Sequence, residues 1–333
     1  MNILITGGAG FLGTLLARSL LERGTLCGQA VTGLTLADLV APAHAALQSG
    51  SGPVALRHDV GDLLQRLDAL FTQDFDAVFH LASAVSAECE TDFGLGLRSN
   101  LDTTRSLLDR LRAQHARTGR APLLFFSSSV AVYGSDPALP LPAVVTDETL
   151  PTPQSSYGVH KFVCEQLVAD YTRKGYIDGR TARLMTVSVR PGRPNGAASS
   201  FLSGIVREPL AGVDAVCPVA LQTQVALSSP ATTIRGILAV AEATREAFGG
   251  RTALNLPALT VTVGEMLDAL QRAGGDAARA RVRMAPDAGI ERIVGGWPSR
   301  FESRRAQQLG LLADADFDTV IAQYRSSLDG AAG

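Results

Sequence analysis

The sequence predicts an α/β fold in which a doubly wound parallel sheet is joined to a smaller, mixed α/β C-terminal lobe. Short apolar runs alternate with helical patterns up to residue 190, and this alternation is typical of a parallel sheet covered by helices on both faces. The pattern changes at a turn-rich segment that begins at Pro191. We therefore expect residues 1–190 and about 226–250 to form the sheet domain. The substrate-binding lobe is expected from about 191–225 and 256–333.

The expected elements follow one another at short intervals. The predicted strands are short apolar or β-branched runs at residues 3–5, 34–36, 77–79, 123–126 and 186–189. The predicted helices of the sheet domain show helical spacing of apolar residues at 11–23, 100–115 and 157–174. Two later helices are expected near 232–247 and 263–273.

Composition excludes several classes of function. With 46% hydrophobic residues, 19% charged residues and a net charge of −2, the chain reads as globular, without the basic surface that nucleic acids or anionic membranes require. No apolar run is long enough to span a bilayer and no signal peptide is visible, so a cytoplasmic location is expected. The four cysteines are scattered and no histidine cluster accompanies them, so we expect no metal site.

A glycine-rich segment lies directly after the first predicted strand and opens the first predicted helix. Gly7, Gly10 and Gly13 have the GxxGxxG spacing. Glycines here allow a tight turn, a close approach of pyrophosphate to the backbone, and close packing of helix on strand. The helix N-terminus adds N–H donors and a positive dipole end. The segment therefore predicts a dinucleotide-binding domain of the Rossmann type.

Two acidic residues suggest how the adenosine half of the cofactor is held. Asp38 ends the second predicted strand, where a carboxylate accepts hydrogen bonds from ribose hydroxyls and repels the extra phosphate of NADP. The nearest basic residue downstream is Arg57, so NAD is favoured over NADP. Asp59 and Val60 follow later, where a loop could meet the adenine edge.

A Tyr-x-x-x-Lys sequence lies within a predicted helix. Tyr157 and Lys161 are four residues apart and share one helix face. A phenol has a pKa near 10 and is a poor base at neutral pH, but a neighbouring ammonium favours the phenolate. The chain contains only two lysines, Lys161 and Lys174, so a chance match is uncommon. We interpret the pair as catalytic.

Three consecutive serines, 127–129, follow the strand predicted at 123–126. Residues at the carboxyl end of a parallel strand face the cofactor crevice, and a serine there can donate a hydrogen bond to a reacting oxygen. Spacing alone does not decide which of the three serines is catalytic.

Taken in order, these motifs resemble the extended short-chain dehydrogenases, a superfamily that includes nucleotide-sugar epimerases and dehydratases. The resemblance covers roughly the whole chain, and it is carried by the glycine loop, His80-Leu81-Ala82-Ser83, Asn100, Ser129 with Val132-Tyr133-Gly134, Tyr157 with Lys161, and Arg190-Pro191-Gly192. It implies that Ser129, Tyr157 and Lys161 are the catalytic residues. It also implies the cofactor contacts Gly7, Gly10, Phe11, Leu12, Gly13, Asp38, Asp59, Val60, Leu81, Ala82, Ser83, Asn100, Tyr157, Lys161 and Pro191. Neither His80 nor His160 is expected to act in catalysis.

The substrate is indicated by departures from the sugar-nucleotide members. Those relatives carry Arg-x-x-Asn where this chain has Arg190 followed by Arg193, and an arginine suits a carboxylate. Stretches such as 191–201, 207–212 and 254–257 resemble the members that oxidise the C2 hydroxyl of a four-carbon sugar acid, D-erythronate, with NAD. The expected substrate contacts are Ser129, Tyr157, Arg193, Ser199 and Ser200.

Other readings stay open at this point. An NAD-dependent nucleotide-sugar 4-epimerase would have the same cofactor motifs, and so would a non-catalytic NAD-binding protein or a dehydrogenase of another alcohol. The sequence does not fix the length or stereochemistry of the acid. Related enzymes pair two helices across a two-fold axis, so a homodimer is expected by analogy.

Overall fold

A computed structural model describes residues 1–48, 52–192 and 198–329 of the chain. The contacts divide it into two compact units, and each is described by itself. Unit 1 consists of Met1–Ser129, Ser155–Arg183 and Gly236–Leu254. Unit 2 consists of Val130–Gln154, Leu184–Arg235 and Asn255–Gly333.

Unit 1 is built on a seven-stranded sheet, which confirms the α/β fold class. The strands in spatial order are β13 (Leu254–Asn255), β9 (Asp178–Leu184), β7 (Leu123–Ser129), β6 (Ala77–His80), β1 (Asn2–Thr6), β4 (Gly33–Asp38) and β5 (Ala55–Val60). The four pairs from β7 to β5 are parallel. The order reverses direction on either side of β1, as expected of a doubly wound sheet.

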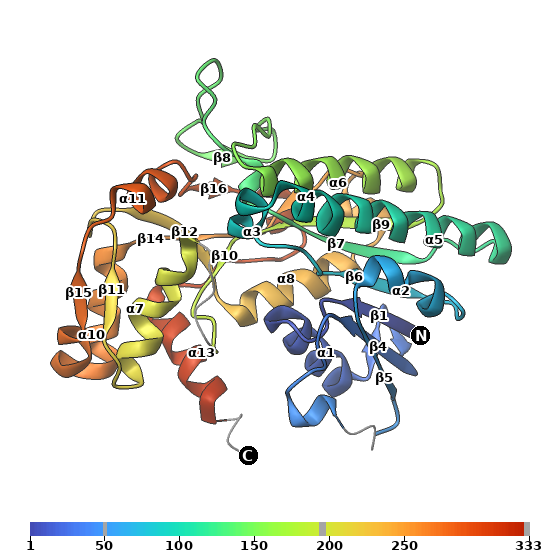
Figure 1. The fold of residues 1–333 in the computed structure, drawn as a ribbon, viewed down its shortest axis with the longest axis horizontal. Helices are drawn as coiled ribbons and strands as arrows, with labels where there is room; N and C mark the ends of the chain where they lie inside the picture. The colour runs from blue at the N-terminus through green and yellow to red at the C-terminus, as the bar shows by residue number, and fades with distance from the viewer. Residues whose placement is uncertain (49–51, 193–197, 330–333) are drawn as a thin grey trace. The chain divides into compact units, whose positions relative to one another are not determined.

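Helices cover both faces of this sheet (Figure 1). Helix α1 (Phe11–Arg23) lies on one face. Helices α2 (Leu63–Leu70), α5 (Thr103–Thr118) and α6 (Ser156–Arg173) cover the other. Apolar side chains of α2, α5 and α6 form a core with those of the strands. This core includes Leu4, Val78, Leu124, Phe126, Leu67, Leu107, Leu111, Cys164 and Val168. The predicted strands at 3–5, 34–36, 77–79 and 123–126 are confirmed.

One prediction about the sheet is wrong. Residues 186–189 were expected to form a strand of the main sheet, but β10 (Thr186–Val187) belongs to a separate three-stranded sheet with β12 (Gln224–Ser228) and β14 (Leu259–Thr262). The strand that follows α6 in the main sheet is β9. Arg180 and Arg183 interrupt its apolar pattern, and both are buried and paired with acidic groups in the fold. Buried parallel strands usually appear in a sequence as continuous apolar runs. The two arginines break such a run in β9, so the sequence did not predict this strand.

Unit 2 has its own core. Helices α7 (Phe201–Leu210), α10 (Val263–Ala280) and α13 (Phe317–Asp329) pack together around side chains such as Leu202, Ile205, Val225, Met266, Leu270 and Val320. The helix expected at 232–247 lies mostly in unit 1, to which residues 236–254 belong, and it is divided into α8 (Pro230–Glu242) and α9 (Arg245–Phe248). Thr244 caps α9 and thereby ends the run.

The remaining elements are short. They are β2 (Thr25–Leu26), β3 (Gln29–Ala30), η1 (Ala45–Leu47), α3 (Ser86–Thr91), α4 (Phe93–Gly96), the π-helical turn η2 (Leu97–Asp102), η3 (Val130–Val132), β8 (Val145–Thr146), η4 (Ala198–Ser200), β11 (Ala215–Cys217), β15 (Val282–Met284), α11 (Ala288–Gly295), β16 (Phe301–Glu302) and α12 (Arg304–Gln308). Within the described ranges, no helix is both long and apolar enough to cross a membrane.

Candidate active site

The carboxyl ends of five strands of unit 1 gather most of the residues predicted to bind cofactor. The glycine loop follows β1, Asp38 ends β4, Asp59 and Val60 end β5, Leu81–Ser83 follow β6, and Ser129 ends β7. Because parallel strands point the same way, these residues lie along one edge of the sheet.

The glycine loop is packed so closely that side chains are excluded. Gly7 adopts a φ of +72°, a left-handed conformation that glycine tolerates best. A Cβ atom on Gly13 would lie 2.0 Å from the carbonyl oxygen of Gly7, so helix and loop can touch only without a side chain. Helix α1 has neither a side-chain N-cap nor an acidic residue in its first turn. Its N-terminal amides are therefore available to an anionic group.

The two predicted adenosine contacts differ in their surroundings. The Asp38 carboxylate accepts hydrogen bonds from the backbone amides of Ala9 (2.9 Å) and Gly10 (3.2 Å), which places it against the glycine loop. Asp59 forms a two-point ion pair with Arg66, with distances of 2.7 and 2.9 Å. Arg66 thereby fixes the orientation of Asp59 at the end of β5.

Asn100 organises the segment after β6. It lies in the π-helical turn η2, where its side-chain oxygen accepts hydrogen bonds from the Ala84 amide (2.7 Å) and the Ser83 hydroxyl (3.0 Å). Its amide nitrogen donates to the Ala84 carbonyl oxygen (3.2 Å). Asn100 thus ties this loop to a π-helical turn, a rare feature that often occurs at functional sites.

Tyr157 lies in the first turn of α6, which Ser155 caps through the amide of Gly158. The side chains of Ser129 and Ser83 are hydrogen-bonded to its phenol. Burial raises the pKa of Tyr157 to about 12, and these two hydrogen bonds oppose the rise. The structure thus brings together the tyrosine and the serine that the resemblance assigned to catalysis.

Lys161 is buried one turn further along α6. Its ammonium donates a 2.8 Å hydrogen bond to the carbonyl oxygen of Ser127 and lies 5.0 Å from the centre of the Phe126 ring. Burial lowers the pKa of Lys161 to about 8, and nearby groups including Glu165 oppose that change. The ammonium is therefore held in place by the strand that carries Ser129.

His80 is buried at the end of β6 and hydrogen-bonds residues of two neighbouring elements. Burial, with Lys161 nearby, lowers the pKa of His80 to about 3, so the ring is neutral. Thr104 donates its hydroxyl hydrogen to the Asn100 carbonyl oxygen (2.6 Å), and therefore accepts from Nε2–H of His80 (2.9 Å). Nδ1 of His80 then accepts from the Thr6 hydroxyl (2.6 Å). This chain joins β1, β6 and α5.

The remaining predicted residues belong to unit 2 or lie outside the described residues. Arg193 lies in the segment 193–197, which the structure does not describe. Ser199 and Ser200 lie in η4, and Pro191 belongs to the same unit.

Sequence reasoning missed Glu165 and Arg183, which form a buried cluster with Ser128 close to Lys161. Glu165 is buried on α6, where it accepts hydrogen bonds from the Ser128 hydroxyl (2.5 Å) and from Arg183 Nη2 (2.7 Å) and Nε (2.8 Å). The signal was present, because Glu165 stands four residues after Lys161 and eight after Tyr157 on the same helix.

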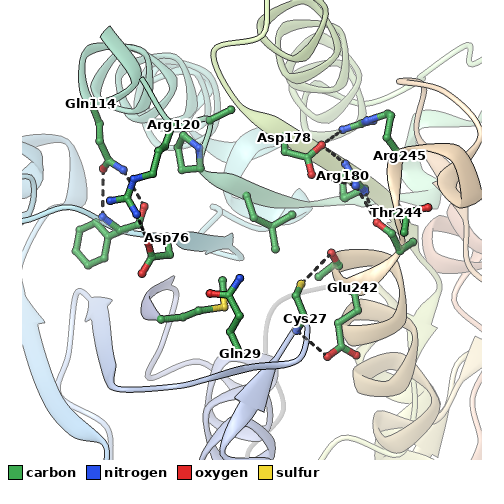
Figure 2. Close-up of a pocket in the computed structure, with 17 residues that line it drawn as sticks. Cys27, Gln29, Asp76, Gln114, Arg120, Asp178, Arg180, Glu242, Thr244 and Arg245 are labelled. Atoms are coloured by element: carbon green, nitrogen blue, oxygen red, sulfur yellow. Dashed lines mark hydrogen bonds and ion pairs between the residues drawn. The ribbon is translucent and has the colours of Figure 1, made fainter. Parts of the chain in front are cut away.

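A cavity of about 410 Å³ lies elsewhere in unit 1 (Figure 2). Its lining includes residues at or just before the amino ends of strands, namely Met1, Asp76, Leu123 and Asp178. Figure 2 shows Asp178 between Arg180 and Arg245, with ion pairs to both. None of the predicted site residues lines this cavity, and it lies at the opposite edge of the sheet from the glycine loop.

The comparison with protein families decides where the chain belongs. The model of the NAD dependent epimerase/dehydratase family matches residues 3–244, which include the glycine loop, Ser129, Tyr157 and Lys161. The chain belongs to this family. This confirms the predicted membership of the extended short-chain dehydrogenases and their use of NAD.

Similar proteins cover nearly the whole chain. It is 49% identical to the D-erythronate dehydrogenase of Cupriavidus necator, over 97% of this chain and 98% of the relative. It is 39% identical to the D-erythronate dehydrogenase of Haemophilus influenzae, again over 97% and 98%. Among solved structures, a nucleoside-diphosphate-sugar epimerase from Agrobacterium tumefaciens has a TM-score of 0.91 and 38% identity, covering 99% of this chain and 95% of that chain.

The residues at the carboxyl edge fit the cofactor of this family. The uncapped N-terminus of α1 suits a pyrophosphate, and Asp38 stands where a ribose would be hydrogen-bonded. Lys161 and Tyr157 lie on α6 and are hydrogen-bonded to the carboxyl end of β7, where the nicotinamide half would be held. In the part of the chain that the structure describes, no cluster of His, Cys, Asp or Glu could hold a metal ion.

Proposed function

We propose that the protein is an NAD-dependent dehydrogenase that oxidises the C2 hydroxyl of a small sugar acid, D-erythronate, to 2-dehydro-D-erythronate. The observation that carries this proposal is the hydrogen bonding of Tyr157 to Ser129, beside the buried ammonium of Lys161. Such a set suits the removal of a hydroxyl proton. The full-length similarity to two D-erythronate dehydrogenases supports this choice of substrate.

Tyr157, Ser129 and Lys161 have distinct tasks in this reaction. Tyr157 accepts the proton of the C2 hydroxyl, and Ser129 donates a hydrogen bond to the same oxygen. Lys161 stabilises the phenolate of Tyr157 by its charge and holds the cofactor ribose. NAD, when bound, supplies the acceptor for the hydride from C2. One D-erythronate and one NAD⁺ thus give one 2-oxo acid, one NADH and one proton.

On this proposal, the acid is held by Arg193, Ser199 and Ser200. Arg193 pairs with the carboxylate, because an anion removed from water must be matched by charge. Ser199 and Ser200 hydrogen-bond the remaining hydroxyls of the acid. The substitution of arginine for the asparagine usual in sugar-nucleotide relatives supports this assignment.

A substrate screen tests the proposal. Purified protein is incubated with NAD and four- to six-carbon sugar acids of both configurations at C2, and NADH is followed by its absorbance. We expect D-erythronate to give the highest kcat/KM and a 2-oxo acid product. Epimerisation of a UDP-sugar without net NADH formation would instead favour the 4-epimerase alternative. The similar structure from Agrobacterium tumefaciens is named a nucleoside-diphosphate-sugar epimerase, so this activity is included in the test.

We further propose that the protein is a homodimer. Helix α6 exposes Val159 (43%) and Val163 (38%), and Phe93 at the start of α4 is 62% exposed. Apolar side chains on one helix are well suited to pack against a symmetric copy. Sedimentation should give about twice the mass of one chain, and Val159→Glu combined with Val163→Glu should give the mass of one.

A further inference from the structure

Strand β7 and helix α6 are joined at three successive points. Tyr157, Lys161 and Glu165 are spaced four residues apart, so they lie one above another on one face of α6. Their partners on β7 are three consecutive residues, namely Ser129 for Tyr157, the Ser127 carbonyl oxygen for Lys161 and the Ser128 hydroxyl for Glu165. The contacts of Tyr157 and Lys161 belong to the proposed catalytic site. The contact between Glu165 and Ser128 is the third point, and it lies further along α6.

The third point is a buried ionic cluster. The Glu165 side chain is 1% exposed and that of Arg183 is 8% exposed. Arg183 lies on β9, so Glu165 joins α6 to two adjacent strands of the sheet, β7 and β9. A buried ion pair often contributes less stability than apolar residues of the same volume, so stability alone does not account for it. Directional hydrogen bonds within such a cluster hold its side chains, and the elements that carry them, in one relative orientation.

We propose that Glu165 is a positioning residue for the catalytic pair. Through Ser128 and Arg183 it fixes the end of β7 against α6, so that the Ser127 carbonyl oxygen meets the Lys161 ammonium and the Ser129 hydroxyl meets the Tyr157 phenol. Glu165 touches neither Tyr157 nor the reacting atoms. The inference rests on the proposed dehydrogenase function only for its kinetic readouts.

Glu165 also acts on Lys161 by charge. The titratable groups that face Lys161 come from three elements and are Tyr157, Cys164 and Glu165 of α6, Cys89 of α3, and His80 of β6. Glu165 is the only carboxylate of these. Burial raises the pKa of both thiols and lowers that of His80, so these three groups are neutral near pH 7. Removing the charge of Glu165 should therefore lower the pKa of Lys161.

Glu165→Gln is the principal test, and Asp178→Asn is its matched control. Both changes replace a carboxylate that faces a buried arginine of β9, but Asp178 pairs with Arg180 at the far end of the strand. We expect Glu165→Gln to lower kcat by about 10-fold or more, because charged hydrogen bonds to both strands are weakened. KM for NAD should change less than kcat, and Asp178→Asn should keep normal turnover. Equal kinetic losses in the two variants would overturn the proposal.

Ser128 offers a milder version of the same test. Ser128→Ala removes only the hydroxyl that joins β7 to Glu165, and Ser128→Thr restores it. The alanine variant should lose part of kcat and the threonine variant should recover it, both with the pH profile of the native protein. If alanine and threonine turn over equally fast, the third point has no role in positioning.

The titration of Lys161 supplies a readout that needs no substrate. The chain has two lysines, and the second, Lys174, is exposed, so protein labelled with ¹³C in lysine gives two side-chain signals. We expect the midpoint of the Lys161 signal to fall in Glu165→Gln and to stay in place in Ser128→Ala and Asp178→Asn. An unmoved midpoint in Glu165→Gln would contradict the charge effect. If the native protein fails to oxidise D-erythronate, the proposed function falls while this titration still decides the inference.

Discussion

The ammonium of Lys161 lies 5.6 Å from the centre of the Tyr157 ring, one turn away on the same helix. The two side chains are held by neighbouring residues of β7, through the Ser127 carbonyl oxygen and the Ser129 hydroxyl. Helix spacing sets their separation, and the strand sets their direction.

Replacing Tyr157 by phenylalanine should remove the proton acceptor and little else. We expect kcat to fall by about 10²- to 10⁴-fold, the usual contribution of a general acid–base group, with nearly unchanged affinity for NADH. Steady-state kinetics and NADH fluorescence measure the two effects. Tyr171→Phe on the same helix, which removes a hydrogen bond to Asp109, is the control and should keep normal activity. Near-normal turnover of Tyr157→Phe would show that another residue is the base.

Asp38 should make NAD a much better cofactor than NADP. Its carboxylate stands against the glycine loop, so the 2′-phosphate of NADP would meet a second anion there. We expect Asp38→Ala to narrow the ratio of kcat/KM values for the two cofactors. Asp68→Ala, on the surface of α2, should leave the ratio unchanged. A native preference for NADP would disprove the assignment.

Two helical glycines should respond in opposite ways to the same substitution. Gly13→Ala places a Cβ atom 2.0 Å from the Gly7 carbonyl oxygen, so loop and helix must separate and NAD binding should be lost. Gly295→Ala, in α11, meets nothing within 4 Å and should be neutral or slightly stabilising. Thermal unfolding with and without NAD compares them. Tight NAD binding by Gly13→Ala would contradict the packing of this loop.

His80 should make the fold sensitive to acid. Its pKa is lowered from 6.5 to about 3 in the folded chain, so between these values the unfolded chain binds a proton that the folded chain does not. Stability from this group is complete above pH 6.5 and falls as the pH decreases, by up to about 1.4 kcal/mol per pH unit. Urea unfolding at pH 7 and pH 5 should show the loss, and His80→Asn should reduce the difference. An equal pH dependence in the variant would assign the effect to other groups.

Arg193, which lies outside the described residues, is the proposed partner of the substrate carboxylate. If it holds the substrate carboxylate, Arg193→Ala should raise KM for D-erythronate by about 10- to 150-fold, because hydrogen bonds to charged groups contribute roughly 1.5–3 kcal/mol. NAD binding should be unaffected. The uncharged four-carbon polyol erythritol serves as the comparison, and its oxidation should suffer far less. If acid and polyol suffer equally, the carboxylate is held elsewhere.

The sequence predicted those parts of the site that follow local rules. The glycine loop, Asp38 and the Tyr157/Lys161 spacing each depend on a few adjacent residues, and the fold places them along one edge of the sheet. Local rules could not choose among the three serines of β7, because that choice depends on which side chain meets Tyr157 in the fold. In the structure, Ser129 is hydrogen-bonded to Tyr157, and Ser128 is hydrogen-bonded to Glu165.

The sequence failed where tertiary contacts outweigh local pattern. Strand β9 carries two arginines, and only the fold shows that Glu165 and Asp178 neutralise them. Residues 186–189 have the β-branched composition of a central strand, yet only Thr186–Val187 form a strand, and it pairs with β12. The π-helical turn around Asn100 was also beyond prediction, since the local sequence is compatible with an ordinary helix.

Three hydrogen bonds run in series from Thr6 through His80 and Thr104 to Asn100. In each of them the donor is the residue nearer Thr6. Each hydroxyl hydrogen in this series is already donated, and the histidine would have to carry two protons for the series to conduct one. The low pKa of His80 makes that state inaccessible near neutral pH. This series of hydrogen bonds therefore connects the elements without conducting protons. If Tyr157 takes the substrate proton as proposed above, the hydrogen bonds of His80 do not offer that proton a route near neutral pH.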